Sequence, residues 1–477
     1  LLDRGPQSRK AMDLLMRLQS QAPDSGGRVH VLLGNHELMN LSGDLRDVSD
    51  AEHAALADLG GHAAAFAHDG HYGSWLLNLP FMIRINGILF THGGLPPMLD
   101  DFSLAEINET ARQDLRTLLT EGQRLREAGV LAGEIDLLSA TYEASDETLA
   151  ALGAKFVSAA DSKLLGAQGP LWYRGTAACH EVLENPGVTA TLAALNAQKV
   201  VVGHTPTANR EINGRLNKRV YVIDTGMLAQ VYKGNPRMLE ITAARLRALD
   251  AGGEEVPITH LPAADPLLQL ASDNYQLQEG AQGITPLTFA DPATGNFESD
   301  GALPGVFRKL SKRDARRAIA AYRLDRELGI NMVPASLQRN IGKQQGVVIA
   351  WPHRPFPEST RQQSNIRRPN WCARDSDFSL LAAFDALIGK TDRSANNLFY
   401  ERGTMNIRIT ENFNAFGTAT KLPQTAMQRV LPRALQDPLQ RLNMENLSTL
   451  LQDLLKPKEI QALLNRRDAI VLWPRSQ

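Results

Sequence analysis

Three polar clusters supply most of the side chains in this sequence that could do chemistry. Residues 34–37 read Gly-Asn-His-Glu, and two further glycine-flanked clusters contain His92 and His204. An amide oxygen together with imidazole nitrogens makes a mixed ligand set that suits Mn, Fe or Zn. We therefore interpret Asn35, His92 and His204 as metal ligands.

Other residues near these clusters could complete a phosphate-ester hydrolase. His36 follows a predicted ligand directly, so it would lie close to the metal without binding it, which suits a general acid that protonates a leaving alkoxide. Asp3 could hold the second ring nitrogen of His36 and fix its tautomer. Arg4 and Arg174 could hold phosphate oxygens through bidentate hydrogen bonds. A metal pair, an acid and cationic donors are what hydrolysis of a phosphate monoester requires.

Short apolar segments precede the clusters and predict the strands that position them. These segments are residues 29–33, a hairpin over 81–90 that turns at Asn86-Gly87, residues 200–202 and residues 220–223. Asn-Gly is a strong hairpin signal. Each cluster therefore follows the carboxyl end of a strand, where open α/β architectures place their ligand sites.

Helical patterns surround these strands. Apolar residues at helical spacing predict a helix over 11–22. Residues 104–165 are charged and alanine-rich, and we expect them to form a helical insert or lid. The first half of the chain is therefore expected to be α/β.

The second half contains residues spaced for phosphoryl transfer. Asp392 and Asn397 lie five positions apart, a spacing typical of a catalytic loop in which the Asp positions a hydroxyl and the Asn holds magnesium. Glu411 could supply a second acidic metal ligand on a following strand. Lys309 could be the lysine that contacts ATP phosphates.

The ordered motifs of the first half resemble a known family. The strings DRGPxS at 3–8, GNHE at 34–37, THGGLPP at 91–97 and GHTP at 203–206 resemble the signature set of the serine/threonine phosphoprotein phosphatases, within the calcineurin-like metallophosphoesterases. GNHELMNLSGDLR and GPLWYRG look most like the Shewanella-like, bacterial-type branch. The resemblance covers roughly residues 1–245. It implies a β-sandwich flanked by helices, two divalent metal ions, and phosphoproteins or other phosphomonoesters as substrates.

The same resemblance implies a role for each motif residue. Asn35, His92 and His204 would be metal ligands, His36 the proton donor paired to Asp3, and the arginines the phosphate clamps. The family's D-x-H motif has no counterpart in its usual place, although residues 69–71 spell it after GNHE. The first Asp of the family's GDxxDRG motif would lie just before Leu1. We therefore expect the natural N-terminus to be missing, and the chain as given to hold at most one metal weakly.

Residues 300–420 resemble a different group, the atypical kinases related to phosphatidylinositol 4-kinases. The pattern GKTDRSANN at 389–397, followed by ITENFNAF, is similar to that group's catalytic loop and metal-binding strand. Glu411 replaces the usual Asp, Lys390 replaces an Asn, and Ala318 stands where a Glu would pair the lysine. Arg308 is the better match to the lysine column. A kinase that uses Mg-ATP, a degenerate kinase-like domain and an unrelated helical domain all remain open.

Composition limits the other possibilities. The 477 residues, with 43% hydrophobic and 22% charged, indicate a globular protein of more than one domain. The net charge of −1 argues against a nucleic-acid partner, and no segment is apolar enough to span a membrane. The two cysteines, Cys179 and Cys372, fall in different predicted domains, so no disulfide framework is expected.

The predicted organisation has three parts. Residues 1–250 would form a metallophosphoesterase domain with an insert at about 100–165, residues 251–275 a linker, and residues 276–477 an α+β kinase-like domain. The predicted function is metal-dependent hydrolysis of phosphomonoesters, with phosphoproteins as the expected substrates. The alternatives are a catalytically defective fragment or nucleotide-sensing protein, and a bifunctional phosphatase and kinase. A domain that uses ATP would favour a cytoplasmic location.

Overall fold

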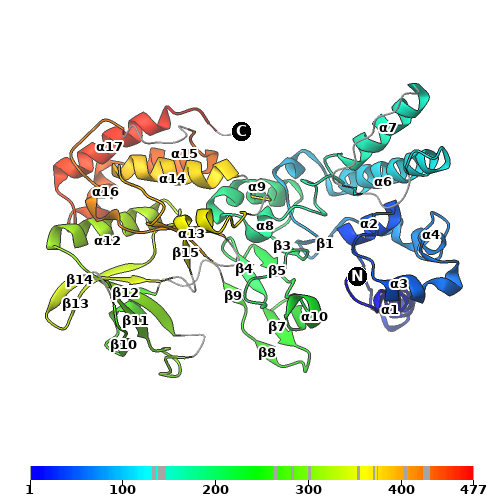
Figure 1. Cartoon of the computed structure of the whole chain (residues 1–477), viewed down its shortest axis with the longest axis horizontal. Coiled ribbons are helices and arrows are strands. Elements are labelled where there is room, and N and C mark those ends of the chain that lie inside the picture. Colours follow the sequence, from blue (N-terminus) through cyan, green and yellow to red (C-terminus); the bar gives the residue numbers. More distant parts are fainter. Residues whose placement is uncertain are drawn as a thin grey trace. The chain divides into compact units, whose positions relative to one another are not determined.

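The chain divides into two compact units (Figure 1). The computed structural model describes residues 2–131, 136–137, 147–260, 266–280, 284–298, 302–351, 355–368, 371–372, 374–401, 405–422 and 430–475. The first unit contains residues 1–178 and 186–261, and the second contains 179–185 and 262–477. Among the described helices, none has the combined length and apolarity needed to cross a bilayer.

The first unit is an α/β structure. Its helices are α1 Ser8–Gln21, α2 Asn35–Ser42, α3 Asp50–Ala55, α4 His62–Ala65, α5 Gly73–Leu76, α6 Leu104–Glu127, α7 Glu147–Ala160, α8 Gly175–Ala178, most of α9 Glu181–Ala194, and α10 Ala229–Tyr232. Its strands are β1 Met82–Ile85, β2 Ile88–Thr91, β3 Lys199–Val202, β4 Asn213–Arg215, β5 Val220–Val222, β6 Arg237–Ile241, β7 Leu246–Asp250, β8 Glu255–Val256 and β9 Thr259–His260.

Two sheets organise these strands. The larger sheet has the order β1-β2-β3-β5-β4-β9, and the smaller has the order β6-β7-β8. Strands β2, β3 and β5 are parallel neighbours, so their carboxyl ends meet at one edge of the sheet. His92 follows β2 and His204 lies two residues beyond β3. The parallel pairing is therefore what brings these two predicted ligands to the same edge.

The predicted hairpin is confirmed. β1 and β2 pair in antiparallel register with Ile85 opposite Ile88. Asn86 and Gly87 both have a positive φ, at 50° and 75°, as a two-residue type I′ turn requires.

The predicted strand over residues 29–33 is wrong. This segment belongs to no sheet of the described residues, and its Leu33 N–H donates to the Pro80 carbonyl outside any strand ladder. A strand exists only where successive backbone groups pair with a neighbour. Val31 and Leu33 are nevertheless buried, which explains why the apolar pattern resembled a strand.

The second unit is α+β. Its helices are α11 Leu267–Ala271, α12 Lys312–Glu327, α13 Glu358–Gln363, α14 Arg374–Ile388, α15 Arg433–Arg441, α16 Met444–Leu451 and α17 Pro457–Val471. Its strands are β10 Tyr275–Leu277, β11 Ile284–Phe289, β12 Leu303–Lys309, β13 Ser336–Ile341, β14 Gln344–Ala350, β15 Phe356–Pro357, β16 Leu398–Tyr400 and β17 Ile407–Ile409. They form a five-stranded sheet, β10-β11-β12-β14-β13, and a three-stranded sheet, β15-β16-β17. Within this unit the helices α14 to α17 gather on one side and the larger sheet on the other (Figure 1). The predicted fold classes of both halves are confirmed.

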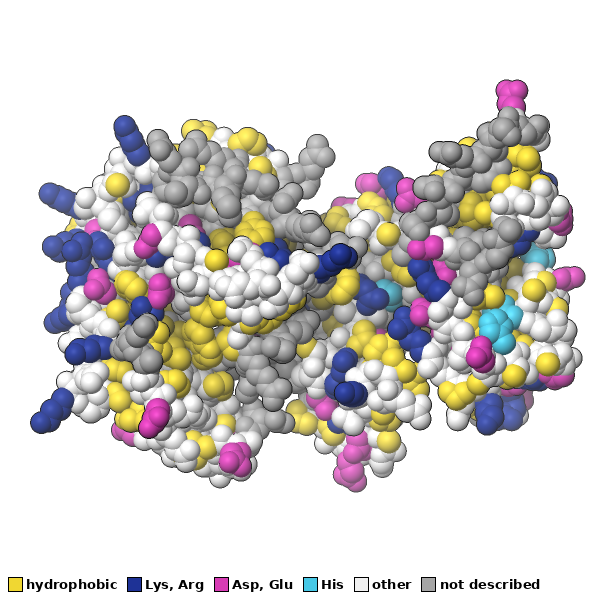
Figure 2. Space-filling model, in the orientation of Figure 1, with side chains coloured by type: hydrophobic (Ala, Val, Ile, Leu, Met, Phe, Trp, Pro, Cys, Tyr) yellow, Lys and Arg dark blue, Asp and Glu magenta, His cyan; other side chains and the backbone are white. Residues whose placement is uncertain are grey.

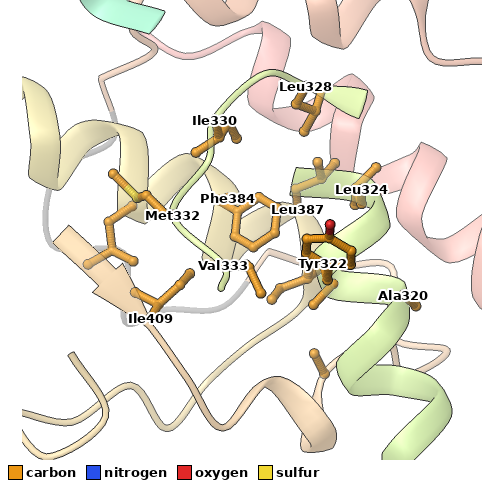
Figure 3. Close-up of a cluster of buried hydrophobic side chains, with 14 of the residues drawn as sticks. Ala320, Tyr322, Leu324, Leu328, Ile330, Met332, Val333, Phe384, Leu387 and Ile409 are labelled. Atoms are coloured by element: carbon orange, nitrogen blue, oxygen red, sulfur yellow. The ribbon is translucent and has the colours of Figure 1, made fainter. Parts of the chain in front are cut away.

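A large apolar core joins the elements of the second unit (Figure 3). Tyr322 and Leu324 from α12 pack with Phe384 and Leu387 from α14, and Ile409 from β17 completes the group. Each of these five side chains is at most 3% exposed. Full burial of such a side chain contributes about 1.5–3 kcal/mol, so this core fixes α12 against α14 and the loop that follows it.

The boundary between the units differs from the predicted one. Unit 1 extends to residue 261, because β9 adds to the larger sheet beside β4. The predicted linker, residues 251–275, therefore contains β8, β9 and α11. The predicted insert corresponds to α6 and α7, which pack together.

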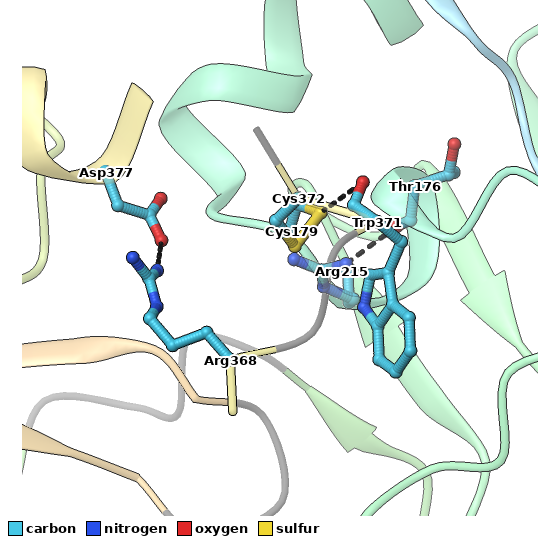
Figure 4. Close-up of a disulfide and its surroundings, with 7 residues drawn as sticks. All are labelled: Thr176, Cys179, Arg215, Arg368, Trp371, Cys372 and Asp377. Atoms are coloured by element: carbon cyan, nitrogen blue, oxygen red, sulfur yellow. Dashed lines mark hydrogen bonds and ion pairs between the residues drawn. A yellow bond between two sulfur atoms is a disulfide. The ribbon is translucent and has the colours of Figure 1, made fainter. Parts of the chain in front are cut away.

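The expectation about the cysteines is wrong. Cys179 and Cys372 form a disulfide with their Cα atoms 5.5 Å apart (Figure 4). Both belong to the second unit, because the segment 179–185 leaves the first unit in the middle of its sequence. Val182 and Leu183 of that segment pack against the core of the second unit. Tertiary packing thus pairs residues 193 positions apart, which spacing alone did not reveal.

Candidate functional site

The first residues of α2 form one wall of the site in the first unit. Gly34 precedes the helix, and its backbone N–H donates to Glu37 Oε2 at 2.8 Å. A Cβ on Gly34 would lie 2.5 Å from that carboxylate oxygen and 2.9 Å from the ring of His92. Only glycine therefore allows the start of α2 to approach the end of β2 so closely. Asn35 is the first residue of the helix and is buried.

The three predicted metal ligands meet at one point. His92 Nε2 lies 2.7 Å from Asn35 Oδ1 and 3.2 Å from His204 Nδ1. Burial lowers the pKa of His92 to about 4. Burial, assisted by the charge of His92, lowers the pKa of His204 to about 2. Both rings are therefore neutral near pH 7, the form in which imidazole binds metals.

This donor set fits one part of a metal centre. It supplies an amide oxygen and two imidazoles, and His204 Nε2 is buried without a hydrogen-bond partner. Among the described residues, no group of three or more His, Cys, Asp or Glu side chains could hold a metal ion. Three ligands are fewer than two metal ions need, so the residues fit a metal but do not by themselves complete a pair.

His36 is oriented by a chain of hydrogen bonds. Its Nδ1 lies 2.5 Å from Asp3 Oδ2, and Asp3 Oδ1 accepts from Asn40 Nδ2 at 2.9 Å. Asn40 Nδ2 also donates to the His36 carbonyl at 2.9 Å. The chain ends at His62 Nε2, 2.7 Å from Asn40 Oδ1. This arrangement leaves His36 Nε2 as the nitrogen that can carry or release a proton.

The donors and acceptors in this series of hydrogen bonds determine where its protons lie. Asp3 and the His36 carbonyl only accept, so Asn40 must present its amide nitrogen to them and its oxygen to His62. His62 then donates from Nε2. Burial lowers the pKa of His62 to about 4, which keeps the ring neutral while it stacks on Phe66.

The two predicted phosphate-binding arginines lie beside the same site. Arg174 Nη1 donates to the His204 carbonyl at 2.8 Å and to Thr205 Oγ1 at 3.3 Å. Burial lowers the pKa of Arg174, and the positive charge of Arg4 acts in the same direction. Arg4 is more exposed and donates to Asp47 Oδ2 at 3.0 Å. Two guanidinium groups are therefore close enough to influence each other.

Two glycines hold the Arg174 segment in place. The N–H groups of Gly93 and Gly94 both donate to the Pro170 carbonyl, at 2.9 and 3.1 Å. A Cβ at Gly94 would lie 2.7 Å from the Tyr173 carbonyl. The THGG motif therefore serves the site twice: it supplies His92 and allows the segment before Arg174 to pack against it.

Backbone strain is concentrated at the site. Asp3, Arg4 and His204 have φ values of 71°, 61° and 62°, in the left-handed region that costs non-glycine residues of order 1–3 kcal/mol. Three of the seven residues predicted for this site are thus held in unfavourable backbone conformations by their surroundings. For Asp3, those surroundings include Glu52 Oε1, which accepts from its N–H at 3.2 Å.

Sequence reasoning missed four supporting residues: Asn40, Asp47, Glu52 and His62. Asn40 had a usable signal, because it lies four residues after His36 and so on the same face of α2. The other three are brought in by tertiary folding. Asp47, for example, also lies 3.9 Å from His36 Nδ1.

The kinase-like residues of the second unit form a second polar cluster. Arg308 Nη1 contacts Glu411 Oε1 at 2.5 Å. Lys390 Nζ contacts Asp392 Oδ1 at 2.7 Å, and donates to the Glu411 carbonyl and to Asn414 Oδ1. Asn414 Nδ2 also donates to Asp392. Two of the predicted residues, Asp392 and Glu411, are therefore linked through Lys390.

The structure does not bring Lys309 to this cluster. Lys309 is the last residue of β12 and is exposed, whereas its neighbour Arg308 points to Glu411. Side chains alternate between the two faces of a strand, so only one of the pair can face the cluster. Asn397 is buried, and its Oδ1 accepts from the Ser394 N–H at 3.0 Å, so it supports the loop backbone.

Residues 1–208 match the family model described as calcineurin-like phosphoesterase. An uncharacterized protein of Schizosaccharomyces pombe is 29% identical over 249 residues, covering 51% of this chain and 64% of that protein. Shewanella-like protein phosphatase 1 of Plasmodium berghei is 26% identical over 254 residues, covering 52% and 62%. The chain thus spans less than two thirds of the length of these relatives. The predicted similarity to the Shewanella-like branch is confirmed.

Two solved structures align loosely with different parts of the chain. The cold-active protein-tyrosine phosphatase of a psychrophilic Shewanella is 27% identical, covering 54% of this chain and 66% of that one, with a TM-score of 0.39. The Golgi casein kinase is 13% identical, covering 41% and 71%, with a TM-score of 0.27. Neither alignment is close enough to decide the fold or activity of either unit.

Proposed function

We propose that the first unit, in which residues 1–208 match the calcineurin-like phosphoesterase model, hydrolyses phosphate monoesters, with phosphoproteins as its substrates. The observation that supports this most strongly is the 2.5 Å contact between His36 Nδ1 and Asp3, beside the point where Asn35, His92 and His204 meet. An oriented acid next to a set of metal-binding atoms is what phosphomonoester hydrolysis needs.

Each residue has one role in this proposal. Asn35, His92 and His204 would hold divalent metal, which when bound supplies positive charge and lowers the pKa of a bound water. Arg4 and Arg174 bind the non-bridging phosphoryl oxygens and orient the ester. His36 Nε2 gives its proton to the leaving oxygen, while Asp3 stabilises the ring as it changes charge.

The substrate class rests on the relatives. One of them carries the name protein phosphatase, and protein phosphoesters such as phosphoserine have poor alkoxide leaving groups. An acid in the position of His36 matters most for such leaving groups. The choice among Mn, Fe and Zn follows only from the N/O ligand set.

The test is phosphate release from a phosphoserine peptide and from an aryl phosphate with added Mn²⁺. The chain should be assayed alone and together with whatever residues its gene encodes before Leu1. His36→Asn is the test variant, and His71→Asn is the matched control because His71 is exposed on the surface. We expect His36→Asn to lose at least ~100-fold in kcat on the peptide, and His71→Asn to lose nothing. Equal activity in the two variants, or no phosphate release from either form, would refute the proposal.

A further inference from the structure

A cavity in the second unit has the dimensions and lining of a small-molecule site. Its volume is about 200 Å³, against the roughly 10–15 Å³ that a single water requires. Most of its lining is apolar and comes from Val306, Val333, Ile349, Trp351, Phe399 and Ile409. Figure 2 shows hydrophobic side chains gathered on this face of the unit, near β12 and β15. An apolar cavity with a few convergent polar groups is the usual form of a ligand site.

Four polar residues that line the cavity are neighbours, because Thr410, Glu411 and Asn412 are consecutive and Arg308 contacts Glu411. Arg308 also lies over the ring of Phe413, 5.1 Å from its centre. The cavity therefore combines apolar and aromatic walls with a group of neighbouring polar side chains, here called its polar end.

Glu411, which lines the cavity, and two acidic groups of α14 and the loop that follows it already have a cation from the protein. Glu411 contacts Arg308 at 2.5 Å, Asp392 contacts Lys390 at 2.7 Å, and Asp385 contacts Arg393 at 2.6 Å. These three ion pairs sum to zero charge. The cluster thus attracts neither a divalent cation nor a polyphosphate through its net charge.

Internal groups of the protein already occupy the oxygens that a metal ion would need. The Lys390 side chain is 1% exposed, and its contacts with Asp392, Asn414 and the Glu411 backbone account for the three N–H donors of an ammonium group. The predicted magnesium ligands are occupied as well, because the Glu411 carboxylate contacts Arg308 and Asn397 Oδ1 accepts from the Ser394 N–H. Magnesium would have to displace these partners. The described residues therefore do not fit Mg-ATP as a cofactor.

We propose that this cavity binds a nucleoside without a divalent cation, and that the phosphates of a nucleotide contribute nothing to its affinity. The planar base lies between the apolar walls, where stacking on aromatic side chains is favourable. The sugar hydroxyls donate to Glu411 and to neighbouring side-chain oxygens at the polar end. The second unit then responds to a nucleoside and transfers no phosphoryl group. This proposal is independent of the proposed activity of the first unit.

The experiment measures binding of adenosine, guanosine, cytidine, uridine, ADP and ATP through intrinsic tryptophan fluorescence and thermal unfolding of the full chain. Each ligand is tested in EDTA and in excess Mg²⁺. We expect at least one nucleoside to bind in EDTA, with less than a twofold change in Kd on adding Mg²⁺. We also expect its diphosphate to bind no more tightly. Binding that requires Mg²⁺, a strong preference for the triphosphate, or no binding by any nucleoside would overturn the proposal.

Two variants locate the site and test the role of Lys390. Val306→Phe fills the cavity and should weaken nucleoside binding at least tenfold, whereas Lys343→Gln, in the exposed turn after β13, should not change it. Lys390→Met removes the internal cation with little change in volume. The melting temperature of Lys390→Met should therefore change when Mg²⁺ is added, whereas that of the unaltered chain should not. If Val306→Phe folds with a normal melting profile and binds as before, the nucleoside does not occupy this cavity.

Discussion

Each unit brings chemically active side chains together, but the charges of those side chains are balanced in different ways. In the first unit, Asn35, His92 and His204 meet as neutral groups, and the nearby Glu37 carboxylate raises the pKa of His92 less than burial lowers it. In the second unit, Asp392 and Glu411 each lie against an internal cation. Neutral ligands whose lone pairs converge are stabilised by an added metal ion, whereas carboxylates that are already paired gain little from one. A cluster of chemically active residues therefore indicates that a metal or cofactor binds only when the cluster's own charged side chains do not already pair with one another.

The pKa shifts in the two clusters differ in the same way, because burial dominates in the first, whereas ion pairs oppose the effect of burial in the second. Burial dominates in the first unit and lowers the pKa values of His92 and His204. In the second unit burial alone would raise the pKa of Asp392, but the hydrogen bonds from Lys390 and Asn414 lower it. Burial likewise lowers the pKa of Lys390, and the contact with Asp392 opposes that shift. The second cluster therefore keeps its charges in pairs without help from a ligand.

The largest expected effect comes from removing divalent metal. Chelation with EDTA should reduce phosphate release by the first unit on the order of a thousandfold, because a bound metal supplies several kcal/mol of transition-state stabilisation. Nucleoside binding by the second unit should be unchanged in the same samples. Both responses can be followed in one titration, with phosphate release and tryptophan fluorescence as separate readouts. Full phosphatase activity in EDTA would remove the contrast between the units.

The next largest effect is a loss of folding stability at low pH, caused by protonation of the buried His62 ring. Burial lowers its pKa from 6.5 in the unfolded chain to about 4 in the folded one, so the unfolded chain binds a proton more readily. The stabilisation is therefore complete above pH 6.5 and is lost as the pH falls toward 4. A shift of this size corresponds to ~3 kcal/mol at most. Other charges near the ring are His53, which lowers its pKa further, and Asp3, which raises it.

Urea unfolding at pH 7 and at pH 4.5, in EDTA, measures this loss. His62→Gln keeps a donor toward Asn40 but cannot take up a proton in this range. Between pH 7 and pH 4.5, the unfolding free energy of this variant should therefore fall by about 2–3 kcal/mol less than that of the unaltered chain. His71→Gln serves as the control because His71 is exposed. The buried rings of His92 and His204 titrate in the same direction and remain in all three proteins. An identical pH dependence in the two variants would show that His62 is not held neutral.

The sequence predicted the first site more completely than the second. His92 and His204 follow strand ends, Asn35 and His36 open α2, and glycines at 34, 93 and 94 marked where backbones approach closely. Such positions are set by local patterns that can be read along the chain. The predicted strand at residues 29–33 is the exception. Its side chains Val31 and Leu33 are buried as expected, but among the described residues its backbone pairs with no neighbouring strand.

The second site depended on contacts that no local pattern specifies. Which of Arg308 and Lys309 faces the cluster follows from strand alternation and from the position of β14, which pairs with β12. Lys390 was noted only as a departure from an expected Asn, and its three oxygen partners became visible only in the folded chain. The disulfide was missed for a similar reason, since the apolar residues that bring Cys179 to the second unit follow it in α9.

The smallest effect tests how the first site is held together. Asn40→Ala removes the donor to Asp3 Oδ1 and to the His36 carbonyl, so the acid should be less well oriented while the metal ligands and arginines stay in place. We expect kcat on the phosphoserine peptide to fall about tenfold, the order of ~1.4 kcal/mol expected for one hydrogen bond, with KM changed less than twofold. Asn78→Ala is the matched control, because Asn78 Nδ2 donates to the Ser74 carbonyl four residues earlier, as Asn40 does to His36.

A dependence on the leaving group separates orientation of the acid from general loss of structure. An aryl phosphate departs as a weakly basic phenolate and needs little protonation, whereas the serine alkoxide needs a proton from His36. The deficit of Asn40→Ala should therefore shrink toward the unaltered rate on the aryl ester and be largest on the peptide. If the deficit were equal on both substrates, Asn40 would be supporting the fold of α2 and not the proton donor, and the hydrogen-bond chain from His62 to His36 would have no part in the chemistry.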